Sequence, residues 1–266
     1  SQDKKTGEIR CIYLTVISLG VAMGPFILSF LATIWYGFQP VYIAAALLLI
    51  PPIFLAIFSL KSKTPKTHGS YHHSLRLPFG AWWRTRNIRR VTLARLMLES
   101  FYGLMIIYTP IYLFRVLHFE WSELGIIFTV MLLPFILFDW LGGELADRFW
   151  GEKELMSVGL LITGFALLVM PFIGKMFWVW MLVLFISRVG ASLVETMTET
   201  YFFKNVKAEE TGLLSIFRLT RPAGVILGIV IGILTFNLLS FEIMFFVLAV
   251  MVFWGLRESF SLKDTL

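Results

Sequence analysis

Two long apolar stretches of the sequence contain arginine and glutamate residues, which are rare in such stretches. Arg95 and Glu99 are four residues apart and therefore share one face of a helix, where they can form an ion pair. Arg188, Glu195 and Glu199 lie together in a second apolar stretch. A charged side chain within the hydrocarbon of a membrane faces the protein interior or an aqueous cavity, and usually has a partner. These residues predict a buried site for ion pairing, anion binding or proton transfer.

Each of these side chains suits a different part of that chemistry. Arginine stays charged at essentially any pH, so Arg188 needs a carboxylate, a water-filled cavity or an anionic ligand. Glu99 and Glu195 are candidates for proton coupling, because a carboxylate removed from water can exchange a proton near neutral pH. Arg95 and Glu199 can reach the membrane surface by snorkelling, which favours a structural role. The alternative for the whole set is a structural ion-pair network without a transport function.

Enzymatic chemistry has little support in the sequence. An intramembrane protease or lipid transferase usually needs a Ser/His dyad, a His-containing metal set or paired acids. His68, His72 and His73 fall in a basic stretch, and His118 falls in a short loop. We therefore predict no catalytic residues, no metal site and no cofactor, and intramembrane enzymes remain the weakest alternative.

The elements that carry the charged residues are predicted membrane spans. The 266 residues are 58% hydrophobic and 15% charged, with mean hydropathy +0.81, whereas soluble domains carry roughly 25% charged residues. This composition excludes a soluble enzyme or nucleic-acid-binding domain, and the single Cys11 excludes an intrachain disulfide. A spanning helix needs about 20 apolar residues. Runs of that kind predict an all-α polytopic membrane helix bundle with eight transmembrane helices, over residues 11–36, 40–60, 91–114, 124–146, 155–174, 177–203, 212–236 and 240–256.

The positions of the 23 Lys and Arg residues predict the orientation. Nearly all of them fall on the side of the membrane that holds both ends of the chain and the stretch 61–90, while only Arg115 and Lys175 fall on the other side. Because positive charge collects in cytoplasmic loops, both ends are expected in the cytoplasm, with the chain integral to the plasma (inner) membrane. The net charge of +6 is thus a topology signal that also attracts anionic lipid headgroups, and nucleic acid is not an expected partner.

Small residues at four-residue spacing predict close helix packing. Two such rows occur: Gly20 and Gly24 followed by Pro25, and Gly224, Gly228 and Gly232. Ordinary membrane packing is one interpretation of these rows. The other is a bundle whose helices rock against each other, as in a carrier.

The turn after the fourth apolar run carries a motif. Residues 142–153 read GGELADRFWGEK. This resembles the signature loop G-x-L-A-D-R-x-G-R-K of the major facilitator superfamily, in the copy between that family's eighth and ninth helices, although one residue is inserted and Glu152 replaces a basic residue. The matching positions are Gly143, Leu145, Ala146, Asp147, Arg148, Gly151 and Lys153. A chance arrangement of charges in a short cytoplasmic turn is the alternative.

The resemblance implies that this loop is a conformational latch, which holds the cytoplasmic side closed while the carrier is open outward. Gly143 and Gly151 permit a tight turn, and Asp147 can meet the positive N-terminal end of a neighbouring helix. Asp139, two helical turns earlier, belongs to the same latch or its packing. We expect Asp147 to face the start of the first run, near residues 8–10.

The resemblance also assigns the chain to helices five to twelve of a partial major facilitator fold, with the first four helices missing. Residues 1–60 are then the last two helices of the N-terminal half, 61–90 a basic cytoplasmic interdomain loop, and 91–266 the six-helix C-terminal half. In the family's proton-coupled drug exporters, the fifth helix carries a glycine-rich motif ending in Gly-Pro, which Gly20, Gly24 and Pro25 match in part.

Together these observations predict a secondary active transporter that moves a small molecule by alternating access and couples to protons. The expected partners are that substrate, protons, the lipid bilayer and the missing helices of the same carrier. Arg188 and Glu195 are expected closest to the substrate; Tyr102, Tyr108 and Trp180 are candidate lining residues, although such aromatics more often serve packing. A non-transporting scaffold or receptor on the same fold is the main alternative, and transport by residues 1–266 alone is not expected.

Overall fold

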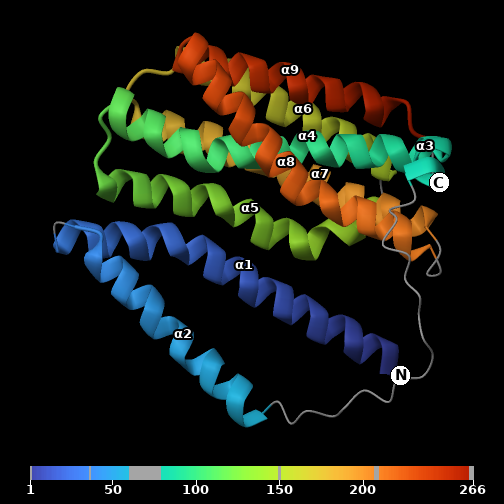
Figure 1. Cartoon of the computed structure of the whole chain (residues 1–266), viewed down its shortest axis with the longest axis horizontal. Helices are drawn as coiled ribbons and strands as arrows, with labels where there is room; N and C mark the ends of the chain where they lie inside the picture. The colour runs from blue at the N-terminus through green and yellow to red at the C-terminus, as the bar shows by residue number, and fades with distance from the viewer. Residues whose placement is uncertain (1, 36, 60–78, 149–150, 207–209, 264–266) are drawn as a thin grey trace.

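The computed structural model describes residues 2–35, 37–59, 79–148, 151–206 and 210–263, and the side chains of residues 16–35, 37–58, 79–137, 151–206 and 210–263 within them. All regular structure in these ranges is helical (Figure 1). The elements are α1 (Gln2–Ile34), α2 (Gln39–Ser59), α3 (Phe79–Arg84), α4 (Arg86–Ile111), the π-helical turn η1 (Tyr112–Val116), α5 (Trp121–Arg148), α6 (Glu152–Val169), the 3-10 turn η2 (Met170–Phe172), α7 (Phe177–Asn205), α8 (Thr211–Leu238) and α9 (Phe241–Phe260).

Seven helices in the described part of the chain are long and apolar enough to cross a membrane. They include every long helix except α5, whose described apolar portion, Trp121–Leu137, is shorter. The predicted all-α polytopic membrane bundle is therefore confirmed, with seven candidate spans and α5 as an eighth long helix. The predicted loop 61–90 is partly helical, because α3 and the first turn of α4 fall within it.

The two extremes of burial show which helix is central. In the apolar 18-residue stretch of α4, 67% of the residues are buried and the mean hydropathy is 1.4. In the corresponding stretch of α2, none is buried and the mean hydropathy is 2.5. A helix surrounded by protein can carry polar groups that a lipid-facing helix cannot. α4 packs against α7, α8 and α9, and α6 packs against α7 and α9. Arg95 and Glu99 of α4, which are buried, therefore lie at the centre of the bundle.

α1 joins this bundle through α5 and carries α2 on its outer side (Figure 1). α1 and α5 are in close contact near the α1–α2 turn. A Cβ added to Gly125 of α5 would lie 2.3 Å from Ser29 Cβ of α1, and the Ser29 hydroxyl donates a hydrogen bond to the Trp121 carbonyl. From there α1 diverges from α5 toward the N-terminus (Figure 1). The bundle is thus tight between these helices at one end and spread at the other.

The glycine row of α8 forms the predicted close contact. A Cβ added to Gly228 would lie 2.2 Å from the Ser100 carbonyl oxygen on α4. At Gly224 the nearest atom would be Glu99 Cβ at 2.5 Å, and at Gly232 it would be a ring atom of Tyr108 at 2.1 Å. These glycines therefore let the α8 backbone lie directly against α4.

The other predicted row, on α1, makes no such contact with the described residues. A Cβ added to Gly20 or Gly24 would meet no atom within 4 Å. The close approach of α1 to α5 depends instead on Gly125 of α5, whose added Cβ would also lie 3.3 Å from the Pro25 carbonyl oxygen. Spacing alone could not distinguish a row that faces a neighbour from one that does not.

Replacing Gly228 by Ala is expected to destabilise the bundle. Its methyl group would collide with the α4 backbone, and overpacking of this kind costs about 1–3 kcal/mol. The thermal unfolding midpoint in detergent should fall for Gly228→Ala and stay unchanged for the matched control Gly20→Ala. Equal midpoints for the two variants would contradict the α4–α8 contact.

Candidate functional site

Arg95 is the centre of a buried ion cluster between α4 and α7. Its Nε atom lies 2.7 Å from Glu99 Oε1, and its Nη2 atom lies 2.9 Å from Glu195 Oε1. Its Nη1 atom lies 3.5 Å from Glu199 Oε1 and also donates a hydrogen bond to the Glu195 carbonyl. The predicted pair of Arg95 and Glu99 is thus present, and α7 adds two further carboxylates to it.

Burial divides the three carboxylates of this cluster. The side chains of Arg95 and Glu99 are 5% and 2% exposed, whereas those of Glu195 and Glu199 are 30% and 50% exposed. The expectation that Arg95 reaches the membrane surface is therefore wrong, because its carboxylate partners hold it inside the bundle. Glu99 is fixed by Arg95 and by the close contact with Gly224, while Glu195 connects the buried pair to more accessible space.

Arg188 lies on the same helix as Glu195 but has a different environment. Its guanidinium lies 4.7 Å from the centre of the Phe101 ring and 5.5 Å from that of Tyr102. The residue is 2% exposed, and its Nε and Nη1 atoms have no hydrogen-bond partner among the described residues. Of the three partners that the sequence left open for Arg188, a carboxylate of the described chain is not the one used.

Tyr102 connects the two arginine environments. Its hydroxyl donates a hydrogen bond of 3.0 Å to Glu195 Oε2, while its ring lies beside the Arg188 guanidinium. The sequence indicated Tyr102 only as a candidate lining residue, because nothing in its spacing shows that its hydroxyl reaches α7. Its partner could have been inferred only from the relative rotation of α4 and α7.

A cavity of about 510 Å³ lies next to the cluster. Five helices contribute to it: Ile17, Ser18 and Val21 (α1), Tyr102 and Ile106 (α4), Leu132 and Phe135 (α5), Glu195, Thr196, Glu199 and Thr200 (α7), and Arg221 (α8). Tyr102 and Glu195, two of the candidate substrate-site residues, line this cavity. Tyr108 and Trp180 do not, because the Tyr108 hydroxyl bonds to the Ile229 carbonyl and the Trp180 Nε1 bonds to the Gly174 carbonyl.

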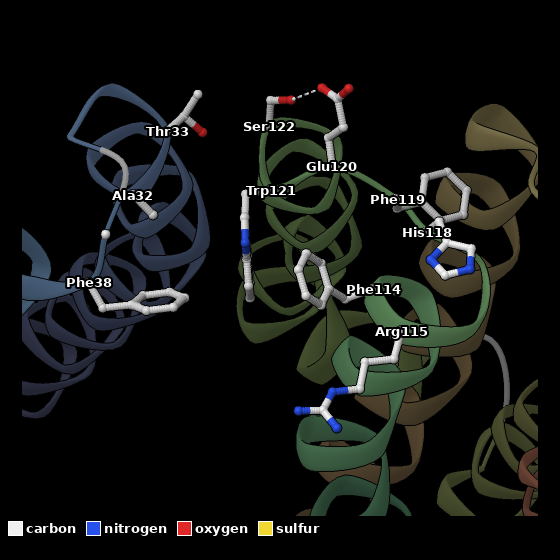
Figure 2. A pocket seen from close by; sticks show the side chains of 11 residues that line it. Ala32, Thr33, Phe38, Phe114, Arg115, His118, Phe119, Glu120, Trp121 and Ser122 are labelled. Atoms are coloured by element: carbon white, nitrogen blue, oxygen red, sulfur yellow. Dashed lines mark hydrogen bonds between the residues drawn. The ribbon is translucent and has the colours of Figure 1, made fainter.

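A larger cavity of about 830 Å³ lies at the end of the bundle near the α1–α2 turn. Figure 2 shows Phe114 and Trp121 side by side, and the Phe38 ring packs edge-on against Trp121 with the ring centres 5.2 Å apart. Its charged lining residues, Arg115 and Glu120, are exposed and belong to the connection between α4 and α5. Since these charges are solvated, this cavity has the character of a vestibule, and the buried ion cluster does not border it.

Most of the predicted latch falls outside the described side chains. This applies to Asp139, Gly143, Leu145, Ala146, Asp147 and Arg148, and to the residues 8–10 expected opposite them. In the described part of the motif, Gly151 precedes α6 with extended backbone. Glu152, which replaces a basic residue of the motif, is buried and forms an ion pair with Lys204 of α7. The departure from the motif therefore has a partner on a neighbouring helix.

A bundle of candidate membrane-spanning helices with a buried ion cluster beside a cavity between the helices has the construction of a membrane carrier. Residues 100–256 match the Major Facilitator Superfamily, and the chain belongs to this family. The family consists typically of transporters rather than enzymes, so the protein is an integral membrane transporter with a small-molecule substrate and the lipid bilayer around it. A search of curated proteins gave no match.

Replacing Arg95 by Gln is expected to destabilise the protein strongly. The change leaves Glu99 buried without its cation, and breaking a buried ion pair from one side costs about 3–5 kcal/mol. The double variant Arg95→Gln with Glu99→Gln should recover much of that loss, because no lone charge remains buried. Chemical unfolding in detergent measures both. A double variant no more stable than Arg95→Gln alone would argue against the pair as the source of the loss.

Proposed function

We propose that this protein is a proton-coupled secondary transporter that works by alternating access. The observation that carries the proposal is the shared position of Glu195, which pairs with the buried Arg95 and also lines the intramembrane cavity. A proton that reaches Glu195 from the cavity neutralises one of the carboxylates on Arg95. The ion pair between Arg95 of α4 and Glu195 of α7 is then weakened. Protonation is thereby linked to the arrangement of these two helices.

The spread between α1 and α5 supports alternating access. The cavity is lined by Ile17, Ser18 and Val21 of α1, which lie on the N-terminal side of the tight contact at Ser29. With the orientation proposed from the Lys and Arg residues, this arrangement is open toward the cytoplasm and closed toward the outside. Closure of the cytoplasmic end would then bring α1 toward the end of α5 that carries the motif residues 142–148.

The orientation in the membrane and the numbering of the helices within the family fold are proposed from the motif and the charge distribution. We place both ends of the chain in the cytoplasm, the protein in the plasma (inner) membrane, and the eight long helices at positions five to twelve of the family fold. The first four helices of the same carrier are then further partners of this chain, and residues 142–153 act as the latch. Transport experiments should therefore use the full product of the gene.

Proton coupling is tested in proteoliposomes that enclose a pH-sensitive dye. Addition of a substrate identified from a chemically varied panel should drive proton movement with the unmodified protein. Glu195→Gln should abolish that movement, since the side chain can no longer accept a proton, whereas Glu199→Gln, on the half-exposed and more weakly paired carboxylate, should retain most of it. Unchanged proton movement with Glu195→Gln would refute the proposed role.

Orientation is tested with single cysteines in a Cys11→Ser background. A membrane-impermeant maleimide added to intact cells should label Lys175→Cys and leave Lys263→Cys unlabelled until the membrane is opened. This follows because Lys175 lies in the η2–α7 connection and Lys263 follows α9 on the opposite side. The reverse pattern would invert the assignment of both ends.

A further inference from the structure

The described charges around the cavity are unevenly distributed. Arg95 is surrounded by Glu99, Glu195 and Glu199, and Arg221 lines the cavity with the last two. With Arg188 included, the described group holds three carboxylates and three arginines. The three carboxylates gather around Arg95, however, and none of those described lies within ion-pair distance of Arg188.

An unpaired buried guanidinium is an unfavourable arrangement for a purely structural residue. Two of its nitrogen atoms have no hydrogen-bond partner among the described side chains and backbone groups. The ring faces of Phe101 and Tyr102 offset part of the desolvation of Arg188 by cation–π attraction. Ring faces do not accept the directed N–H donors as a carboxylate would. The site therefore retains unused capacity to bind an anion.

The Tyr102 side chain lies between the Arg188 guanidinium and the cavity. The ring lines the cavity and at the same time lies 5.5 Å from the Arg188 guanidinium. It packs edge-on against Phe135 and is held by its hydroxyl on Glu195. A movement of this one side chain would open a path between the cavity and Arg188.

The remaining cavity lining indicates the rest of the ligand. Ile17, Val21, Ile106, Leu132 and Phe135 give apolar walls on three helices. The hydroxyl-bearing residues Ser18, Thr196 and Thr200 are the neutral polar groups. A ligand with an apolar, ring-containing body and one anionic group would match both the walls and the arginine.

We propose that the transported substrate is an amphipathic organic anion whose carboxylate pairs with Arg188 after Tyr102 moves aside, accompanied by a proton on Glu195. This rests on the proposed transport function and adds the substrate class to it. When Tyr102 leaves, Glu195 loses a hydrogen-bond donor that stabilises its charged form. The neutral form of Glu195 in turn holds the Tyr102 hydroxyl less strongly. Binding of the anion and of the proton therefore favour each other, as linkage requires.

All described ionisable groups around Glu195 affect how readily it binds a proton. From α4 these are Arg95, Glu99 and Tyr102; from α7, Arg188 and Glu199; and from α8, Arg221. Arg95 contacts both the buried Glu99 and Glu195, so a proton on Glu195 leaves Arg95 paired with Glu99. The cluster can therefore accept a proton without leaving the Arg95 cation alone.

The test measures binding of 2-naphthoate and benzoate to the full gene product in detergent, with 2-naphthamide and benzamide as neutral counterparts. At least one carboxylate should bind, more tightly at lower pH, and its amide should bind at least about tenfold more weakly. Arg188→Gln should remove this preference. Arg115→Gln, a change to the exposed vestibule arginine, is the control and should leave the preference intact. Tyr102→Phe should keep the preference for the carboxylate and reduce the dependence on pH.

Stability separates a ligand site from a structural residue. Arg188→Met should unfold at the same temperature as the unmodified protein or higher, because it removes a buried charge without a partner. A large loss of stability in Arg188→Met, binding of neither carboxylate, or equal binding of acid and amide would each overturn the proposal. If neither carboxylate binds while other compounds drive proton movement, the anion proposal fails and the transport function stands. If a carboxylate binds through Arg188 and no compound moves protons, the coupling fails and the anion site stands.

Discussion

The ion pairs of Arg95 are the interaction on which the rest of the site depends. One guanidinium holds Glu99 on its own helix and Glu195 and Glu199 on α7, and most of this contact is removed from water. In a membrane such charges are tolerated only when they satisfy each other inside the protein. The cluster therefore sets how α4 and α7 face each other. It also joins the packing of the bundle to the carboxylate that we propose as the proton acceptor.

The glycine row of α8 adds a second constraint on α4. Without side chains at Gly224 and Gly228, the α8 backbone approaches Glu99 and the Ser100 carbonyl directly. Helix association in lipid depends on such close approach more than on hydrophobicity. Ion pairs thus hold α4 against α7, and close backbone packing holds it against α8. A change in the charge state of the cluster acts on a helix that has little freedom to move alone.

The two buried arginines show how equal residue types take different roles. Arg95 has its full complement of carboxylates, whereas Arg188 has aromatic faces and unused donors. Tyr102 contacts both regions, through its hydroxyl at Glu195 and through its ring at Arg188. Chemistry that depends on the two sites together must therefore involve this side chain. The exposed charges of the vestibule near Trp121 have no comparable arrangement.

Composition, hydropathy and charge spacing by themselves determined that the chain is a helical membrane bundle, because apolar runs of spanning length have few other structures available. The motif at residues 142–153 correctly indicated the family, and the spacing of Arg95 and Glu99 predicted their pair. Only the tertiary structure decided that Arg95 is central and buried, that Tyr102 reaches Glu195, and that Gly125 rather than Gly20 and Gly24 brings α1 close to α5. Spacing along one helix determines which residues share a face. Which neighbour that face meets depends on the rotation and approach of other helices, and these result from the packing of the whole bundle.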